Sequence, residues 1–306
     1  MDLHKKTHIL GIDLGGTKIE AALIPADDPT RPLARLRLPT EAHLGYDHIV
    51  SQIIKLCDMI KNQTGSELPD TIGIGTPGIS DPRTGTMKNS NTTCLIGKPL
   101  QKDLENGLHR SVIMTNDANC FALAEATWGA ARGYNNIFGV IMGTGVGAGI
   151  VINGKIVEGR HGIAGEWGQI ILDPKGPVSV YGTRGTIESH ISGTGLQNYY
   201  KSLCGEERKL PDIVARARAG HDEAAIDTLE MLKEKFSQAI SIIMNVLDPE
   251  AIVLGGGVGN VEELYSEEVR KKIARQMFND RFESALLKPA LGDSAGVFGA
   301  AMLTIM

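Results

Sequence analysis

Short apolar runs that end at glycine-rich turns alternate along this chain with segments of helical periodicity. Residues 9–12 and 21–24 are apolar runs on either side of one glycine turn, and residues 137–142 lead into a second turn of the same kind. Between them, residues 48–61 repeat apolar side chains at the three- and four-residue spacing of one helix face. The alternation of the two periods predicts an α/β fold.

The rest of the pattern predicts further strands and helices. An apolar run over residues 251–254 enters a row of three glycines, and residues 211–247 follow a helical period. Asn153 and Gly154 form a turn signal between two short apolar runs, which predicts a second hairpin. The other expected elements are strands at residues 35–38, 71–75, 113–115, 150–152 and 156–157 and a helix at residues 117–128.

The order of strand, glycine turn and hairpin occurs once in each half of the chain. This duplication predicts two similar domains that face each other across a central cleft, with one glycine turn in each. We expect an N-terminal α/β domain over residues 1–117 and a larger C-terminal α/β domain over residues 118–292. A C-terminal helix at residues 293–306 is expected to pack back on the first domain.

Each glycine turn is expected to bind an anion through its backbone. The first turn is Asp13–Lys18 and the second is Gly143–Gly147. Gly15 and Gly16 are expected to take positive φ, which a residue with a Cβ adopts only at a cost of roughly 1–2 kcal/mol. Backbone N–H groups in such turns converge on phosphate oxygens. A single turn of this kind is typical of a tight hairpin, whereas two turns favour a polyphosphate site; neither has the Walker or Rossmann spacing.

The side chains of the turns indicate that the polyphosphate carries a metal ion. Asp13 repels a phosphate unless Mg²⁺ or its water shell lies between them. Lys18 adds a positive charge to the first turn, and Thr144 adds a hydroxyl donor to the second. We therefore expect a magnesium-bound polyphosphate.

The composition excludes several classes of partner. The 306 residues are 42% hydrophobic and 22% charged, which is enough for two domains with sizeable cores. A net charge of −5 without a basic block argues against nucleic acid or an anionic membrane. The sequence shows no apolar stretch near the ~18–20 residues of a membrane span and no signal-peptide core, so we expect a cytoplasmic protein. The 4 cysteines form no Cys-x-x-Cys pair and are expected to be reduced thiols.

Asp117 is the candidate general base. It follows a short strand and starts a helical segment, so a phosphate held by the glycine turns could lie close to it. In phosphoryl transfer to an alcohol the hydroxyl proton departs late, and a well-placed weak base is sufficient. The alternative is that Asp117 only caps the helix, and the spacing alone leaves both roles open.

Taken together, several motifs make the chain similar to sugar kinases of the ROK family (repressor, open reading frame, kinase) over nearly its whole length. This resemblance implies the ribonuclease H-like or actin-like ATPase fold. It also implies ATP- and Mg²⁺-dependent phosphorylation of a hexose, with Asp117 as the base. The motifs are Gly11–Lys18, Thr76–Gly78, Asn116–Asn119, Gly143–Gly147, Gly165–Gly168, Gly182–Glu188, Ser192–Gly193 and Val253–Gly257.

Within the family, residues 89–97 resemble the fructokinase branch, so fructose is the expected acceptor. Glucose, mannose and N-acetylhexosamines are the alternatives, corresponding to a glucokinase, a mannokinase or an N-acetylhexosamine kinase. A sugar sensor without catalysis, or a repressor of this family that lacks its DNA-binding module, stays open as a different class. The phosphate turns and Asp117 favour the kinase, and a homodimer is expected.

The resemblance assigns residues to two ligands. For the sugar, directional acceptors for vicinal hydroxyls are offered by amide and carboxylate side chains. The residues implied in sugar binding are Gly78, Asn91, Asn116, Asp117, Glu166, Gln169 and Glu188. The residues implied in ATP binding are Asp13, Gly15, Gly16, Thr17, Lys18, Gly143, Thr144, Gly145, Gly147, Gly255, Gly256 and Gly257, with Asp13 reaching Mg²⁺ through phosphate or water.

The chain departs from the pattern of the ROK proteins it resembles at the positions of a structural zinc site. Related proteins carry a histidine and three cysteines there, whereas this chain has Gln169, Ser179, Tyr181 and Thr186. Neutral amide and hydroxyl groups do not replace imidazole and thiolate ligands. We therefore expect no zinc site. The family histidine also approaches the sugar, so Gln169 is expected to affect which sugar is accepted.

Overall fold

The computed structural model describes residues 8–28, 31–179 and 181–305, and its contacts divide the chain into two compact units. The first unit contains the described residues up to Arg132, Gly149–Ala164 and those from Ala290 onward. The second unit contains Gly133–Ala148 and Gly165–Pro289. In the part of the chain that is described, no helix combines the length and the apolarity that crossing a membrane requires.

The first unit is built on a five-stranded sheet with the order β3-β2-β1-β4-β7. β1 and β2 form the expected antiparallel hairpin, β3 extends it, and β4 and β7 run parallel to β1. The predicted strands are confirmed, with ends extended by a few residues. The bounds are β1 His8–Leu14, β2 Lys18–Pro25, β3 Ala34–Pro39, β4 Thr71–Thr76 and β7 Ser111–Asn116, with the small hairpin β5 Ile79–Ser80 and β6 Met87–Lys88.

The alternation of side chains along β1 decides what covers each face of this sheet. Leu10, Ile12 and Leu14 are buried in one core with the helices α1 (Tyr46–Thr64) and α2 (Leu100–Leu108). Because successive strand residues point to opposite faces, Gly11 and Asp13 lie on the other face. The predicted helix at residues 48–61 is the central part of α1.

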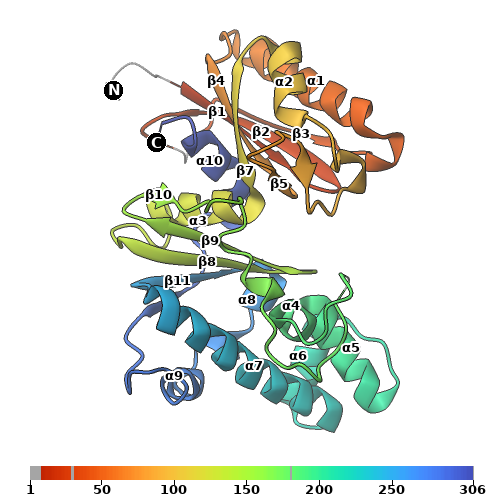
Figure 1. Ribbon diagram of the computed structural model, residues 1–306, viewed down its shortest axis with the longest axis vertical. Helices are drawn as coiled ribbons and strands as arrows, with labels where there is room; N and C mark the ends of the chain where they lie inside the picture. Colours follow the sequence, from red (N-terminus) through yellow and green to blue (C-terminus); the bar gives the residue numbers. More distant parts are fainter. Residues whose placement is uncertain (1–7, 29–30, 180, 306) are drawn as a thin grey trace. The chain divides into compact units, whose positions relative to one another are not determined.

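That other face of the sheet is covered by the C-terminal helix α10 (Ala295–Met302), seen beside β1 in Figure 1. A Cβ at Gly11 would overlap the carbonyl oxygen of Val297, and one at Gly73 in β4 would overlap that of Ala300. The helix backbone therefore rests directly on the strand backbone. Gly299 makes the same approach to α3 (Asp117–Thr127), so α10 packs closely on both strands and on α3.

A buried carboxylate holds the chain that leads into α10. Glu125, near the end of α3, is 0% exposed and accepts hydrogen bonds from the N–H groups of Ala130, Ala290 and Leu291 at 2.8, 3.0 and 3.0 Å. Residues 290 and 291 immediately precede the short turn η6 (Gly292–Ser294) that starts α10. Glu125 therefore joins the end of one helix to the beginning of another, a role that no motif in the sequence indicates.

The second sheet has the order β10-β9-β8-β11-β12, with β11 parallel to β8 and β12. The predicted hairpin between β9 and β10 is confirmed, and its turn residues Asn153 and Gly154 have φ of 50° and 74°. β9 begins in the second unit and continues, with β10, among residues of the first. The bounds are β8 Asn136–Met142, β9 Val146–Ile152, β10 Lys155–Ile156, β11 Ala251–Gly255 and β12 Ala285–Leu287.

The helical segment expected over residues 211–247 is two helices. Gly220, with φ of 74°, ends α6 (Leu210–Ala219), and the Asp222 side chain caps the start of α7 (Glu223–Leu247). The continuous helical period hides this break because both helices bury an apolar face. The other helices of the unit are α4 Ile187–Ile191, α5 Gly193–Cys204, α8 Gly256–Gly259 and α9 Glu267–Ala274.

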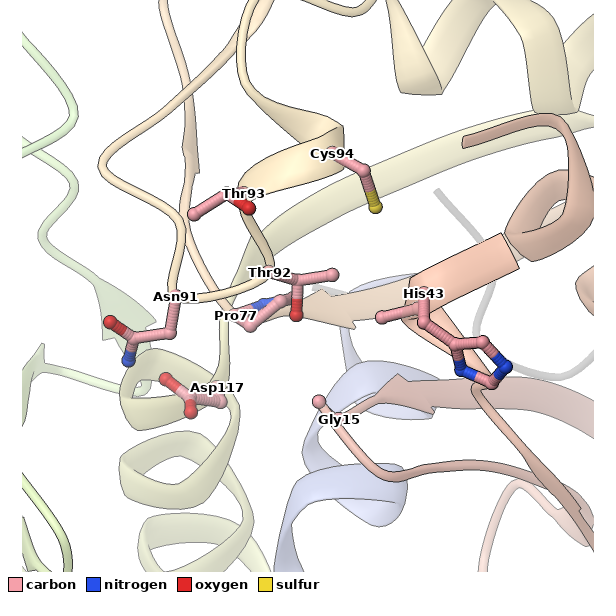
Figure 2. A pocket seen from close by; sticks show the side chains of 10 residues that line it. Gly15, His43, Pro77, Asn91, Thr92, Thr93, Cys94 and Asp117 are labelled. Carbon is pink, nitrogen blue, oxygen red and sulfur yellow. The ribbon is translucent and has the colours of Figure 1, made fainter. Parts of the chain in front are cut away.

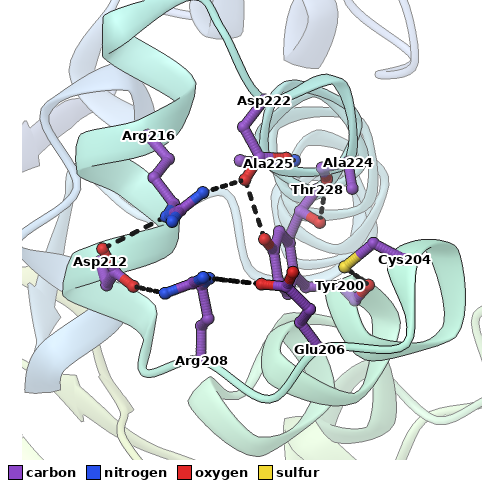
Figure 3. A network of polar contacts seen from close by, with 10 residues as sticks. All are labelled: Tyr200, Cys204, Glu206, Arg208, Asp212, Arg216, Asp222, Ala224, Ala225 and Thr228. Carbon is purple, nitrogen blue, oxygen red and sulfur yellow. Dashed lines mark hydrogen bonds and ion pairs between the residues drawn. The ribbon is translucent and has the colours of Figure 1, made fainter.

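A polar network joins α5, α6 and α7 (Figure 3). The carboxylate of Asp222 accepts from the N–H of Ala225 at 3.0 Å, the hydroxyl of Tyr200 at 2.8 Å and the guanidinium of Arg216 at 3.1 Å. Burial raises the pKa of Asp222, but these hydrogen bonds outweigh burial and hold the pKa below its usual value. One side chain therefore connects three helices.

We expect Glu125→Gln to lower the free energy of unfolding by about 1–3 kcal/mol, because a glutamine amide replaces one acceptor oxygen by a donor and leaves buried N–H groups unpaired. Denaturant unfolding of the full chain measures this change. Glu267→Gln, at an exposed position in the first turn of α9, is the control and should change stability much less. Equal stability of both variants would contradict the role of Glu125.

We expect Asp222→Ala to lower stability at pH 7 by about 1–2 kcal/mol or more, since it removes a helix cap together with two further partners. The folded-state pKa is lowered, so the contribution of Asp222 is present above its unfolded pKa of ~3.9 and lost as pH falls through the folded value. The gap in melting temperature between wild type and variant should therefore narrow below about pH 4. If the difference in melting temperature did not depend on pH, the charge of Asp222 would contribute nothing, and only its role as a helix cap would remain.

Candidate functional site

The first glycine turn connects β1 to β2. The N–H of Gly15 donates to the carbonyl of Lys18 at 2.9 Å, and the hydroxyl of Thr40 donates to the carbonyl of Gly15 at 2.7 Å. The expected positive φ at Gly15 and Gly16 is wrong, because neither residue lies in that region. Space is the reason for glycine at the first position, where a Cβ would lie 3.0 Å from the Lys18 carbonyl oxygen. Gly16, Thr17 and Lys18 are exposed at the turn.

Asp13, the penultimate residue of β1, lies in an acidic environment. Burial raises the pKa of Asp13, and the carboxylates of Asp117 and Glu20 raise it further, to about 6, against the opposing charges of Lys18 and Arg37. Carboxylate oxygens are the ligands that Mg²⁺ prefers, and a hydrated cation relieves the repulsion between neighbouring acids. The Asp13 carboxylate therefore suits contact with a hydrated Mg²⁺.

Asp117 is the first residue of α3, directly after β7. Asn116 is the cap of this helix, since its side-chain oxygen accepts from the N–H of Asn119 at 2.8 Å. The alternative that Asp117 serves only as the cap therefore does not hold. The carboxylate of Asp117 accepts from the N–H of Ala118 at 2.8 Å and is open to solvent through a cavity. The surrounding protein still desolvates it and raises the pKa of Asp117, which the two nearby backbone N–H groups only partly offset.

A cavity of about 430 Å³ in the first unit brings part of the predicted site together (Figure 2). Asn91 and Asp117 face each other at one end of it, and the first glycine turn lies opposite. Four of the predicted residues therefore share one cavity with side chains that sequence reasoning missed. The lining residues are Gly15, Gly16, Ala42, His43, Pro77, Asn91, Thr92, Thr93, Cys94 and Asp117.

Two predicted sugar residues of the first unit do not line this cavity. Gly78 packs against Ser90, because a Cβ there would lie 2.8 Å from the backbone and side chain of that residue. Asn116 is buried and uses its oxygen in the helix cap. Among the missed residues, Thr92 directly follows Asn91 in the sequence, whereas His43 comes from the β3–α1 connection, where no motif points to it.

The second glycine turn connects β8 to β9 in the second unit. The N–H of Gly143 donates to the carbonyl of Gly145 at 2.9 Å, and the N–H of Gly193, the first residue of α5, donates to Gly143 at 2.7 Å. Thr144 is exposed at the tip. The N–H of Val146 donates to the carboxylate of Glu188 at 3.0 Å. A residue assigned to the sugar therefore contacts the turn assigned to phosphate.

The other predicted sugar residues of this unit lie close to Glu188. Burial raises the pKa of Tyr181, and the charges of Glu188 and Glu166 raise it further, so both acids lie near this tyrosine. Gln169 ends the short turn Trp167–Gln169, in which the buried Trp167 indole donates to the carbonyl of Ala239 at 3.1 Å. Trp167 thus serves packing.

Hydrogen bonds organise the loop at the positions of the family's zinc ligands. The N–H of Ser179 donates to Thr183 at 2.8 Å, and the hydroxyl of Thr186 caps α4 by accepting from Ser189 at 3.2 Å. The described residues hold no group of three or more histidine, cysteine, aspartate or glutamate side chains placed for a metal ion. The absence of zinc stays a prediction.

Gly255 ends β11 and is the N-cap residue of α8, which begins with Gly256 and Gly257. Gly256 has φ of 79°, and a Cβ there would overlap the carbonyl oxygen of Met142 at the end of β8. Gly257 has open space around it. The glycines Gly255 and Gly256 therefore bring α8 against the end of β8, next to the second glycine turn, and their role toward ATP stays a prediction.

Comparison with known proteins gives one consistent family. The ROK family matches residues 9–306. The chain is 35% identical over 316 residues to an N-acetyl-D-glucosamine kinase of Pectobacterium atrosepticum, covering 97% of this chain and 98% of that protein. An N-acetyl-D-glucosamine kinase of Vibrio cholerae is 34% identical over 309 residues, covering 96% of this chain and 99% of that protein.

Solved structures show the same actin-like ATPase fold. A ROK hexokinase from Thermus thermophilus has a TM-score of 0.86 at 29% identity and covers 97% of this chain and 99% of its own. A ROK family glucokinase from Streptomyces griseus, in complex with glucose and AMPPNP, has a TM-score of 0.77 at 28% identity, covering 97% of this chain and 98% of its own. The predicted fold is confirmed.

We expect Asp13→Asn to stabilise the protein at pH 7–8 while weakening its binding of Mg²⁺ with nucleotide. The folded-state pKa of about 6 lies above the unfolded ~3.9, so the contribution of Asp13 to stability is lost as pH rises through about 6. The neutral variant avoids this loss and should gain roughly 1–3 kcal/mol above pH 7.

Thermal denaturation at pH 5 and pH 8 measures the change, which should be about half as large at pH 5 as at pH 8, because pH 5 lies between the unfolded and folded pKa values. Asp70→Asn, at an exposed position before β4, is the control. A variant that is less stable than wild type at pH 8 would show that the Asp13 carboxylate is not under charge repulsion.

Proposed function

The chain belongs to the ROK family and is an ATP-dependent sugar kinase, and we propose that its acceptor is an N-acetylhexosamine, with N-acetyl-D-glucosamine as the expected substrate. The observation that carries this proposal is 34–35% identity over almost the whole chain to proteins named N-acetyl-D-glucosamine kinase. The prediction of fructose from residues 89–97 finds no support in these relatives. That segment is too short to outweigh a resemblance along the full length.

The cavity of the first unit supports the proposal chemically. The amide of Asn91 and the hydroxyls of Thr92 and Thr93 can hydrogen-bond to sugar hydroxyls or to an acetamido group. Ala42 and Pro77 add apolar surface suited to a methyl group. A small cavity with a few directional polar groups and some apolar lining is typical of a small-molecule site.

In the proposed reaction Asp117 holds the sugar hydroxyl and takes its proton. The hydroxyl oxygen forms a bond to the γ-phosphorus of ATP while the bond from that phosphorus to ADP breaks. Asp117 needs only weak basicity, because the proton leaves late, and its raised pKa brings it closer to working pH. The glycine turns are proposed to hold the phosphates through backbone N–H groups.

Magnesium is proposed to bind through Asp13, directly or by way of water, where it would neutralise phosphate charge. Lys18, whose charge already acts on Asp13, is proposed to contact the phosphates from the same turn. Glu166, Gln169 and Glu188 are proposed to bind the sugar from the second unit. Gly255–Gly257 are proposed to contact the adenosine.

We expect Asp117→Asn to lower kcat by about 10²–10⁴-fold while the KM for the sugar changes little, because the variant keeps the shape and loses the proton acceptor. A coupled assay for ADP measures this change. Asp47→Asn, in the first turn of α1 and outside the lining of the cavity, is the matched control and should keep wild-type turnover. Near-normal kcat for Asp117→Asn would remove this residue from the base role.

The same assay on wild type tests the acceptor. Among N-acetyl-D-glucosamine, N-acetyl-D-mannosamine, glucose, mannose and fructose, we expect kcat/KM to be highest for N-acetyl-D-glucosamine. A higher kcat/KM for fructose or glucose would overturn the proposed acceptor while leaving the kinase assignment in place.

A further inference from the structure

Glu188 lies where a nucleotide phosphate is expected on the second glycine turn. Its Oε2 accepts from the N–H of Val146 at 3.0 Å. The same oxygen lies 2.6 Å from where a Cβ would stand at Gly145, so the carboxylate lies against the glycine. The turn thus already holds an anion supplied by the chain itself.

Backbone hydrogen bonds hold the turn, and the Glu188 side chain contacts it from α4. Gly143 and Gly145 close the turn with a backbone hydrogen bond of 2.9 Å, and Gly193 ties it to the start of α5 at 2.7 Å. Glu188 is only partly buried and has three side-chain torsions. A change at this contact therefore involves the glutamate rather than the turn.

A carboxylate in this position opposes phosphate binding in two ways. It uses the N–H of Val146 as a donor, and it places a negative charge beside the remaining N–H groups of the turn. Like charges a few ångströms apart repel strongly where water is partly excluded. Nucleotide phosphates bind the turn well only after Glu188 has left it.

The surroundings of Glu188 indicate what draws it away. The N–H of Ile187, next to Glu188 in α4, donates to the carbonyl of Ile170 at 2.9 Å. Helix α4 also contacts the turn that Glu166 begins, so Glu166 and Glu188 lie in one neighbourhood. Both are proposed sugar ligands, and hydroxyl groups donate hydrogen bonds to carboxylates. A sugar bound there offers Glu188 donors that replace the N–H of Val146.

We propose that Glu188 blocks the second glycine turn in the sugar-free protein and that sugar binding releases the turn for ATP. This inference rests on the proposed function, because it takes Glu188 as a sugar ligand and the turn as a phosphate site. It gives the two substrates positive coupling: the sugar raises the affinity for nucleotide, and the nucleotide raises that for the sugar by the same factor. It also limits ATP binding, and hence futile hydrolysis, when sugar is absent.

Calorimetry with the Mg²⁺ complex of AMPPNP tests the proposal on wild type, Glu188→Gln and Glu188→Ala. Without sugar, both variants should bind the nucleotide at least about fivefold more tightly than wild type, the lower end of usual coupling between sites. The glutamine keeps the shape and removes the charge, whereas the alanine removes both the charge and the acceptor. Saturating N-acetyl-D-glucosamine should tighten nucleotide binding to wild type by a similar factor and leave the variants nearly unchanged.

Glu267→Gln is the matched control, because it removes one charge at an exposed position in the first turn of α9, outside both proposed sites. It should leave the sugar-free affinity for nucleotide at the wild-type value. Thermal denaturation confirms that each variant is folded. Unchanged or weaker nucleotide binding by both Glu188 variants would overturn the proposal, since Glu188 would then be neutral or an anchor of the turn.

The sugar-free measurement separates this inference from the proposed acceptor. If N-acetyl-D-glucosamine proves not to be a substrate while Glu188→Gln and Glu188→Ala still bind nucleotide more tightly, the blocking role stands and only the acceptor changes. The coupling measurement is then repeated with the best sugar of the kinase panel. Absence of coupling for that sugar in wild type would refute the release step.

Discussion

The close approach of α10 to β1 and β4 is the constraint on which the first unit depends. Helix and strand backbones touch at Gly11 and Gly73, where any side chain would overlap a carbonyl oxygen of α10. Gly299 extends the same contact to α3. Since Asp13 lies near the end of β1 and Asp117 begins α3, this packing decides how the two acids lie relative to each other. Most core substitutions destabilise by removing atoms and leaving a cavity. Here a substitution of glycine by alanine would add a methyl group that forces the helix and strand backbones apart.

Charge repulsion is the functional consequence of that packing. Asp13 pairs with Glu20 across the β1–β2 hairpin and also senses the charge of Asp117, so its pKa rises to about 6. Glu20 is 1% exposed, and its charge is balanced by ion pairs with Arg35 and Arg37. The positive charges of Lys18 and Arg37 offset only part of the effects that raise the pKa of Asp13. An ATP-dependent sugar kinase needs a site that favours a cation and a phosphate. Charge repulsion at Asp13 lowers the stability of the protein without ligands. A ligand that binds the folded protein at this site raises its stability again.

In the second unit, one proposed sugar ligand contacts the turn that is proposed to bind phosphate. Glu188 belongs to α4, and its carboxylate lies on the turn between β8 and β9. Its neighbourhood also includes Glu166 and Tyr181. The loop that holds Tyr181 is closed by backbone hydrogen bonds at the positions where the family uses zinc ligands. The motifs assign Glu188 to the sugar site and the turn to the phosphate site. The contact between them is the basis for the proposal that sugar binding promotes ATP binding.

The sequence by itself determined the α/β class, most strands, both glycine turns, Asp117 as the candidate base and the ROK resemblance, because these depend on local periodicity and on short motifs. It did not predict the break at Gly220, the ordinary φ of Gly15 and Gly16, or Asn116 rather than Asp117 as the helix cap. Only the tertiary structure decided that Glu125 secures α10, that His43 and Thr92 line the cavity, and that Glu188 contacts Val146. These contacts join residues far apart in the chain, and their distances depend on packing, which no local pattern encodes.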